Sequence, residues 1–264
     1  MSESSAELLR AAEEIAQMAA KCQMRYFGQI DVGDVGFKGR RDLVTDADRE
    51  TEAVIVGEIR KRFPHHAILA EETLASGGEG VASDVPLWII DPIDGTTNFV
   101  HSHPFFASSI AVCLDGSPQA ACVLAPKLDE CYTASLGGGA QLNGRPIHVT
   151  QTTTLADSLL ATGFAYRVGE HADDNLDRFG HIVKEVRAMR RCGSAAIDLC
   201  FVAAGRYDGY WELELSPWDV AAGGLIVREA GGVVTDMAGG DEWLFGRSLL
   251  GAAPGVYEDL LHRL

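Results

Sequence analysis

The stretch Trp88-Ile89-Ile90-Asp91-Pro92-Ile93-Asp94-Gly95-Thr96-Thr97-Asn98-Phe99 joins an apolar run to two acidic residues and a glycine. The apolar residues predict a buried strand. Because Pro92 cannot donate to a strand ladder, we expect the strand to end at Asp91. The side chains of Asp91 and Asp94 then emerge close together at the edge of a sheet.

Two carboxylates this close repel one another in a site with little water unless a proton or a cation lies between them. The donors within reach are oxygen atoms, which favours Mg²⁺ or Mn²⁺ over Zn²⁺. A bare D-x-x-D-G fragment is more often an Asx turn with a helix cap. The fragment alone therefore leaves a metal site and a structural turn as alternatives.

Gly95 permits a tight turn that leads into a helix. Thr96, Thr97 and Asn98 form the expected first turn of that helix. The free N–H groups of a first turn can hold a phosphate. The stretch thus combines candidate metal ligands with a candidate phosphate cradle.

Helical and strand patterns alternate along the first half of the chain. Apolar residues at helical spacing predict helices over 7–27 and 48–62. Short apolar runs predict strands over 67–70, 87–90, 107–114, 120–125 and 130–135. Asn143-Gly144 is a strong hairpin signal, with strands expected over 140–142 and 146–149.

The second half mixes the same two kinds of element. We expect strands near 158–162 and 209–212, and helices near 175–185, 194–204 and 218–230. This pattern predicts an α+β protein of several layers. We expect two halves, over 1–145 and 146–264, with a cleft between them.

The chain has 264 residues and a net charge of −16. An acidic surface repels nucleic-acid backbones and anionic membranes, so we expect neither as a partner. A phosphorylated substrate would be repelled too, and a bound metal ion is the obvious source of local positive charge. We see no basic stretch followed by an apolar one, and no apolar run near the ~20 residues of a membrane helix, so we expect a cytoplasmic protein.

Three further acidic residues lie beside predicted elements. Asp48 fits a capping box with Thr45. Glu71 follows the strand 67–70 directly, where a charged residue commonly marks only the exposed strand end. Asp219, in the segment Trp218-Asp219-Val220-Ala221-Ala222-Gly223, fits an acid in the first turn of a helix. Each residue has an ordinary structural explanation when it is taken alone.

Taken together, these segments resemble the inositol monophosphatase family. The matching blocks follow the family's order and rough spacing, and they are Asp42-Leu43-Val44-Thr45-Asp46-Ala47-Asp48, Glu71-Glu72, 91–99 and 218–223. The resemblance spans nearly the whole chain, and the D-P-x-D-G-T-T and W-D-x-A-[AG]-G blocks are highly specific when found together. It implies a layered αβαβα sandwich of the inositol monophosphatase and fructose bisphosphatase type.

The resemblance also implies ligands for two to three Mg²⁺ ions, or Mn²⁺ in their place. Glu71, Asp91 and the carbonyl of Ile93 would hold one ion. A second ion would be held by Asp91, Asp94 and Asp219, and a third, looser one involves the Glu71 position. The first half thereby supplies most metal ligands, and the second half supplies Asp219 and substrate contacts.

Catalysis in the family implies a metal-activated water as the nucleophile. Thr96, hydrogen-bonded to Asp48, would orient that water beside the metal ligand Glu71. The N–H groups of Gly95 and Thr96 would cradle the phosphate oxygens.

Substrate contacts follow from the same resemblance. Glu212 matches the position that accepts hydrogen bonds from sugar or inositol hydroxyls, and Gly193-Ser194-Ala195 matches a loop near the ring, with Asp219 completing the contacts. A strand-end acid and a helix N-cap at Ser194 explain the same residues without a substrate. Lys38 matches a lysine near the third metal.

The predicted function is Mg²⁺-dependent hydrolysis of a small phosphomonoester, with myo-inositol 1-phosphate as the expected substrate. Histidinol phosphate, fructose 1,6-bisphosphate and 3'-phosphonucleotides are the alternative substrates. A regulatory binding module that reuses the fold is the alternative from another class. The resemblance further implies a homodimer and inhibition by lithium.

Overall fold

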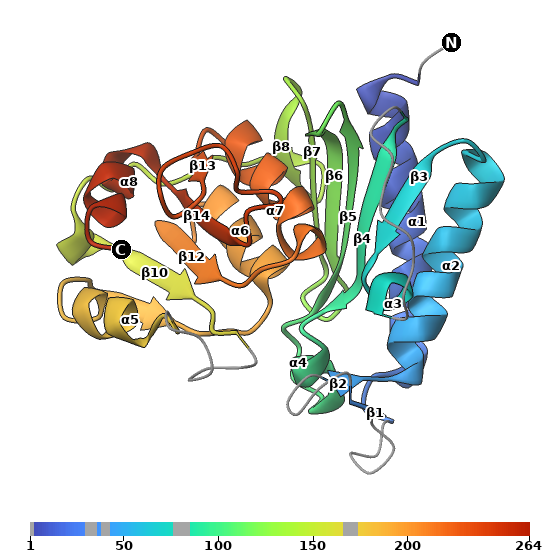
Figure 1. Cartoon of the computed structure of the whole chain (residues 1–264), viewed down its shortest axis with the longest axis horizontal. Helices are drawn as coiled ribbons and strands as arrows, with labels where there is room; N and C mark the ends of the chain where they lie inside the picture. Colours follow the sequence, from blue (N-terminus) through green and yellow to red (C-terminus); the bar gives the residue numbers. More distant parts are fainter. Residues whose placement is uncertain (1–2, 30–35, 38–42, 76–84, 166–173) are drawn as a thin grey trace.

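The computed structural model describes residues 3–29, 36–37, 43–75, 85–165 and 174–264. Its elements stack in the order helix, sheet, helix, sheet, helix (Figure 1). A seven-stranded sheet and a five-stranded sheet form the two β layers. The predicted α+β sandwich with alternating layers is confirmed.

Helices α1 (Ser5–Tyr26) and α2 (Asp46–Arg62) cover the outer face of the seven-stranded sheet (Figure 1). Both begin two residues before the predicted start. A capping box at each N-terminus explains the difference, because Ser4 with Glu7 and Thr45 with Asp48 satisfy the free N–H groups of the first turn.

The seven-stranded sheet runs in the order β3-β4-β5-β6-β7-β8-β9, with a single parallel pair, β3 and β4. Its strands are β3 (Ala67–Ala70), β4 (Leu87–Asp94), β5 (Ala107–Leu114), β6 (Ser117–Ala125), β7 (Glu130–Ser135), β8 (Gly139–Leu142) and β9 (Arg145–Pro146). The predicted hairpin is present, because Asn143 and Gly144 both have positive φ and Leu142 pairs with Arg145. A separate small sheet pairs β1 (Gly36–Phe37) with β2 (Leu43–Val44).

Two predictions at the edge of this sheet are wrong in detail. Strand β4 does not end at Asp91 but continues to Asp94, through a register shift between these two residues. Pro92 is tolerated there because a bulge leaves the extra residues unpaired. Glu71 is not an exposed strand end, since it begins the short helix α3 (Glu71–Ala75) and is half-buried.

The five-stranded sheet has the order β11-β10-β12-β14-β13. Its strands are β10 (Leu159–Thr162), β11 (Ala188–Arg190), β12 (Gly209–Leu213), β13 (Val233–Thr235) and β14 (Ser248–Ala252). Strand β11 was not predicted, and it pairs in parallel with β10. Its three residues are too few to give a period in the sequence.

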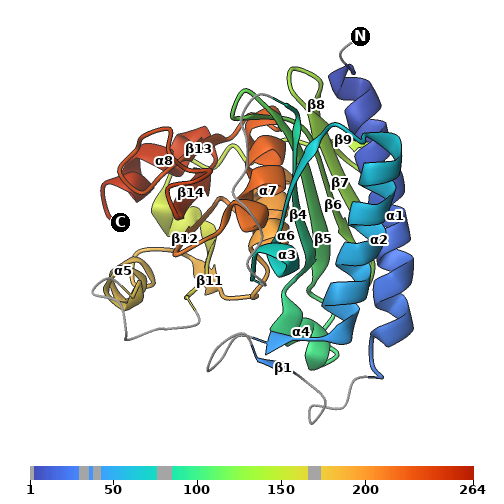
Figure 2. The same ribbon diagram turned by 45° about the vertical axis from the view of Figure 1, so that its right-hand side comes forward.

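Helices α6 (Ala195–Ala203) and α7 (Pro217–Glu229) form the middle layer (Figure 2). Helix α7 packs against the seven-stranded sheet, and both helices contact the five-stranded one. Nearly all their apolar side chains are buried, as a helix between two sheets requires. Helices α5 (Leu176–Ile182) and α8 (Pro254–Leu261) complete the outer layer beyond the second sheet (Figure 1).

One hydrophobic cluster runs from the seven-stranded sheet through α6 and α7 to the second sheet. A second cluster joins that first sheet to α1 and α2. The division into halves over 1–145 and 146–264 stays a prediction. Within the described ranges, no helix combines the length and apolarity that crossing a bilayer requires.

Gln23 anchors α1 to the bulge of β4 from behind the sheet. Its fully buried amide donates from Nε2 to the carbonyl oxygen of Pro92 at 2.7 Å and to Oγ of Ser108 at 2.8 Å. Ser108 Oγ also lies 3.2 Å from the Pro92 oxygen. The irregular end of β4 is therefore held by side chains from two other elements.

We expect Gln23→Leu to lower the free energy of unfolding by about 1–2 kcal/mol, because buried acceptors lose their donor. Urea unfolding followed by circular dichroism measures this change. Gln17→Leu, at an exposed position of the same helix, is the control and should stay within about 0.5 kcal/mol of the parent protein. Equal effects of both substitutions would contradict the anchoring role.

Candidate metal centre

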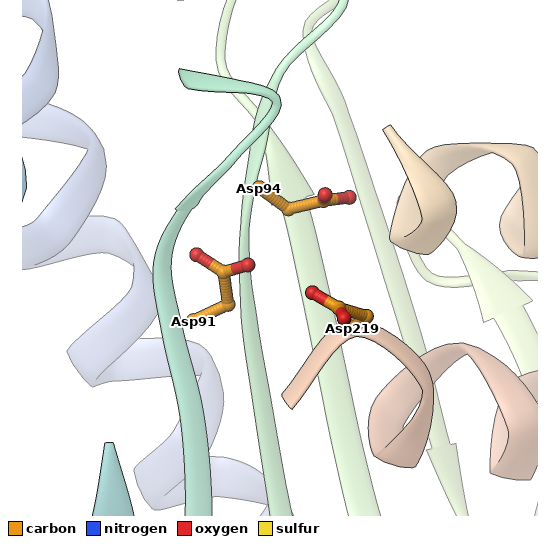
Figure 3. Close-up of side chains that lie close together, drawn as sticks. All are labelled: Asp91, Asp94 and Asp219. Atoms are coloured by element: carbon orange, nitrogen blue, oxygen red, sulfur yellow. The ribbon is translucent and has the colours of Figure 1, made fainter. Parts of the chain in front are cut away.

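Three aspartates meet at the inner edge of the seven-stranded sheet. Asp91 and Asp94 come from the end of β4, and Asp219 comes from the first turn of α7 (Figure 3). One carboxylate oxygen from each lies within 4.8 Å of the others. Asp91 and Asp94 are only 2% and 8% exposed. Segments far apart in the sequence thus deliver three carboxylates to one point.

Asp94 is held by the first turn of α6. Its Oδ2 accepts hydrogen bonds from Oγ of Ser194 at 2.5 Å and from the backbone N–H of Ala196 at 2.7 Å. The positive end of a helix dipole favours a carboxylate at this place. Because Oδ2 is occupied, the geometry leaves Oδ1 for a shared ligand.

Asp91 and Asp219 are fixed in a similar way by their own segments. Oδ1 of Asp91 accepts from the N–H of Ile93 at 2.9 Å, across the bulge. Oδ2 of Asp219 accepts from the N–H of Ser216 at 2.7 Å, at the start of α7. Each carboxylate therefore has one oxygen bound to the protein, which fixes its direction before any ligand arrives.

The electrostatics of the cluster call for a cation. Burial, followed by the charge of Glu71, raises the pKa of Asp91 well above its usual value. Burial, followed by the charge of Asp94, does the same to the pKa of Asp219. Burial also raises the pKa of Asp94 to about 6, against the hydrogen bond from Ser194. A hard divalent cation would remove this repulsion, and the all-oxygen donor set fits Mg²⁺ or Mn²⁺.

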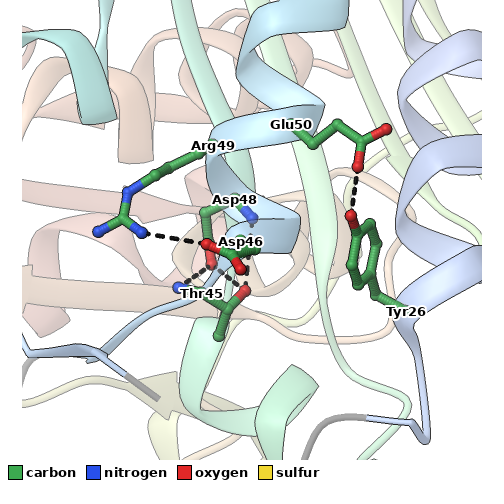
Figure 4. A network of polar contacts seen from close by, with 6 residues as sticks. All are labelled: Tyr26, Thr45, Asp46, Asp48, Arg49 and Glu50. Carbon is green, nitrogen blue, oxygen red and sulfur yellow. Dashed lines mark hydrogen bonds and ion pairs between the residues drawn. The ribbon is translucent and has the colours of Figure 1, made fainter. Parts of the chain in front are cut away.

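Asp48 forms the predicted capping box with Thr45 and also accepts a hydrogen bond from Thr96. Its Oδ2 accepts from N–H and Oγ1 of Thr45 at 2.7 and 2.5 Å, which is the capping box (Figure 4). Its Oδ1 lies 3.1 Å from Oγ1 of Thr96. Asp48 is fully buried, and this burial raises its pKa to about 6.

Thr96 and Gly95 follow at the start of the short helix α4 (Thr96–Val100). Oγ1 of Thr96 is 3.1 Å from both Asp48 Oδ1 and the carbonyl oxygen of Ile93. Gly95 has φ +93°, and a Cβ there would come within 3.0 Å of the carbonyl oxygen of Phe105. Only glycine fits this turn, as the sequence predicted.

A cavity of about 540 Å³ opens beside the cluster. Asp94 and Asp219 line it together with the predicted substrate residues Glu212 and Gly193-Ser194-Ala195. In the described part of the chain, Glu71, Asp91, Ile93, Asp48 and Thr96 do not line it. The predicted site residues that the structure describes are thus divided between those that line the cavity and those that do not.

The sequence did not reveal several contributors to this region. Ser194 is the helix N-cap that the sequence predicted, because its hydroxyl accepts from the N–H of Ile197 at 3.4 Å, but nothing in the sequence indicated that the same hydroxyl donates to Asp94. Asn98 Nδ2 donates to the carbonyl oxygens of Phe105 and Cys192 and so links α4 to Cys192 in the cavity wall. Further wall residues are Arg191, Phe164 and Leu215. Lys38 lies outside the described residues.

Metal binding should stabilise the fold in a pH-dependent manner. Because the pKa of Asp94 is raised to about 6 in the fold, the metal-free protein loses stability as pH rises from the unfolded value of about 4 through 6. Near pH 7.5, Mg²⁺ at a hundred times its Kd should restore roughly 2.7 kcal/mol. Near pH 5 it must displace protons, so we expect a clearly smaller gain.

Thermal unfolding with Mg²⁺ or EDTA at both pH values measures this. Asp219→Asn should abolish the gain in Tm, whereas Asp115→Asn, at an exposed turn far from the cluster, should retain it. A gain that is equal at the two pH values would contradict the raised pKa values of the cluster.

The sequence and the fold of the chain are similar to those of known proteins. Residues 4–264 match the description "Inositol monophosphatase family". Nus factor SuhB of Pseudomonas aeruginosa is 45% identical over 239 residues, which cover 90% of this chain and 88% of that protein. The structure of an inositol monophosphatase from Anabaena (Nostoc) sp. PCC 7120 superposes with a TM-score of 0.87 at 40% identity and covers 97% of this chain and 94% of that one.

A structure of SaIMPase-II with inositol monophosphate bound superposes with a TM-score of 0.80 at 29% identity, covering 97% of this chain and 92% of that one. Both the sequence match and the fold extend over nearly the full chain. The protein therefore belongs to the inositol monophosphatase family.

Proposed function

We propose that this protein hydrolyses a small phosphomonoester with the help of Mg²⁺, and that myo-inositol 1-phosphate is its substrate. The observation that carries the proposal is the cluster of Asp91, Asp94 and Asp219 at the wall of an open cavity. Such a cluster has no structural use of its own, since its mutual repulsion destabilises the metal-free fold.

Two to three ions fit the ligands at hand. Glu71, Asp91 and the Ile93 carbonyl would hold one, and Asp91, Asp94 and Asp219 would hold another. When bound, the metals would lower the pKa of a water, neutralise phosphate charge and stabilise the leaving oxygen.

Thr96 and Asp48 would accept the proton that the attacking water loses. A hydroxyl donates one hydrogen, so Thr96 Oγ1 can donate to Asp48 Oδ1 while its lone pair accepts from a water. Because burial raises the pKa of Asp48 to about 6, this carboxylate is poised to receive a proton near neutral pH. Glu71 would be the third catalytic residue beside Thr96 and Asp48, as the family resemblance implies.

The cavity supports a hydroxyl-rich leaving group. Glu212 lines the wall and offers acceptor oxygens, and Gly193-Ser194-Ala195 border the same space. The relative SaIMPase-II was solved with inositol monophosphate bound. Histidinol phosphate, fructose 1,6-bisphosphate and 3'-phosphonucleotides are the competing substrates. The N–H groups of Gly95 and Thr96 would contact the phosphate.

The first test is phosphate release from a panel of these esters, with Mg²⁺ or with EDTA. We expect release that needs Mg²⁺ and falls by at least about a hundred-fold in Asp94→Asn, since a ligand and a negative charge are lost together. Asp115→Asn is the matched control and should keep full activity. A folded wild-type protein that releases phosphate from no ester would sink the enzymatic proposal.

A second test concerns the hydroxyl of Thr96. Thr96→Val keeps the shape but removes the proton path, so kcat should fall by about a hundred-fold. Thr96→Ser keeps a hydroxyl and should retain activity within about ten-fold of the parent. Steady-state kinetics of both variants measure kcat, and their Tm values show whether they are folded. A folded Thr96→Val variant with near-normal kcat would contradict the role of Thr96.

A binding role that reuses the fold is the second candidate. The observation that favours it is the name Nus factor SuhB of relatives 41–46% identical to this chain, which is not the name of an enzyme. Protein or nucleic-acid partners therefore stay open alongside the phosphorylated metabolite. A homodimer, lithium inhibition and a cytoplasmic location stay predictions.

A further inference from the structure

Tyr210 and Glu212 lie two residues apart on β12, and their side chains share one face of the strand. The hydroxyl of Tyr210 donates a hydrogen bond to Oε2 of Glu212. Tyr210 is fully buried, whereas Glu212 reaches the cavity wall. The tyrosine thus holds one carboxylate oxygen of Glu212 and leaves Oε1 for a ligand.

Gly163 provides the space that the Glu212 carboxylate occupies. A Cβ atom at this position would lie 1.9 Å from Oε2 and 2.1 Å from Cδ of Glu212. The backbone of Gly163 has no positive φ, so any residue could adopt its conformation. Its lack of a side chain therefore serves the placement of Glu212 and not the path of the backbone.

Asn175 ties the end of β10, next to Gly163, to β12. Its Nδ2 donates to the carbonyl oxygen of Gly163 at 2.8 Å and to Oγ1 of Thr162 at 2.9 Å. Its Oδ1 accepts from Nε1 of Trp211 at 2.7 Å. Thr162 Oγ1 in turn donates to the Trp211 carbonyl oxygen at 2.7 Å. The amide is 2% exposed, and every polar atom of it is used.

We propose that Tyr210, Gly163 and Asn175 are positioning residues that fix the Glu212 carboxylate in the cavity and thereby select esters whose leaving group carries hydroxyls. The inference rests on the proposed function. An acceptor that is already in place loses no conformational freedom when the substrate binds. A carboxylate that can rotate away would bind the same hydroxyl more weakly without affecting the metal cluster.

The experiment compares two six-membered-ring esters, myo-inositol 1-phosphate and phenyl phosphate, the second of which lacks ring hydroxyls. In Tyr210→Phe and Gly163→Ala, KM for inositol 1-phosphate should rise by about ten-fold, as expected for one weakened hydrogen bond to a charged group. The kcat/KM for phenyl phosphate should stay within about two-fold, because that ester makes no such bond. Asn175→Ala should give a shift in the same direction.

The chain offers closely matched controls. Tyr132 is fully buried, and its hydroxyl donates to Glu130 at 2.7 Å, again two residues away on one strand but outside the cavity lining. Gly180 lies in α5, and a Cβ there would meet nothing within 4 Å. Tyr132→Phe and Gly180→Ala should leave the ratio of the two kcat/KM values unchanged.

Failure of the positioning role and failure of the proposed phosphatase activity give different results in this experiment. Equal losses on both esters would show a merely structural network and overturn the inference, as would an unchanged ratio in Tyr210→Phe. If Gly163→Ala does not fold, Tyr210→Phe decides alone. Wild-type protein that releases phosphate from neither ester would overturn the proposed function, and the inference with it.

Discussion

The repulsion among three buried carboxylates is the constraint on which the rest of the site depends. Asp91, Asp94 and Asp219 would move apart, or become protonated, if their surroundings allowed it. The structure prevents the first by giving each carboxylate a donor of its own, from Ile93, Ser194 and Ser216 respectively. The structure does not prevent protonation, and the pKa values of the three carboxylates are accordingly raised. Rigid carboxylates with high proton affinity are also good ligands for a hard cation.

The surrounding fold supplies the rigidity. The bulge in β4 lets Asp91 and Asp94 both turn toward the middle layer, and α1 braces the bulge through Gln23. The first turns of α6 and α7 then approach the cluster from the side opposite the sheet. Because both turns direct backbone N–H groups at carboxylates, their dipoles offset part of the repulsion. The layers therefore position the three carboxylates beside the cavity.

The three aspartates of the cluster could be picked out from the sequence because they lie in short blocks that resemble those of the inositol monophosphatase family. Asp91 and Asp94 are three residues apart, and Asp219 begins a recognisable helix. The alternation of helical and strand patterns predicted an α+β protein of several layers, and the order of those layers followed from the family resemblance. Strand β11 and the exact end of β4 could not be predicted, since a short strand has no period and a bulge breaks one.

The residues around Glu212 could not be predicted from the sequence for another reason. Gly163 meets Glu212 only because β10 and β12 pair in parallel with Thr162 opposite Trp211. Such a register is a property of the assembled sheet, and neither residue carries a local signal for it. Arg191 and Phe164 likewise reach the cavity wall from separate segments whose meeting depends on tertiary packing.

The position of Asp219 has a consequence for the order in which the protein folds. Strands β4 and β5 are made early in synthesis, whereas α7 emerges from the ribosome only after β10 to β12. Contacts between such distant segments form slowly, because a long loop must close first. A nascent chain consequently holds Asp91 and Asp94 without their third partner, and Asp219 joins them only when the middle layer docks. Divalent cations in the cell would then act on the step in which the middle layer docks rather than on the formation of the first sheet.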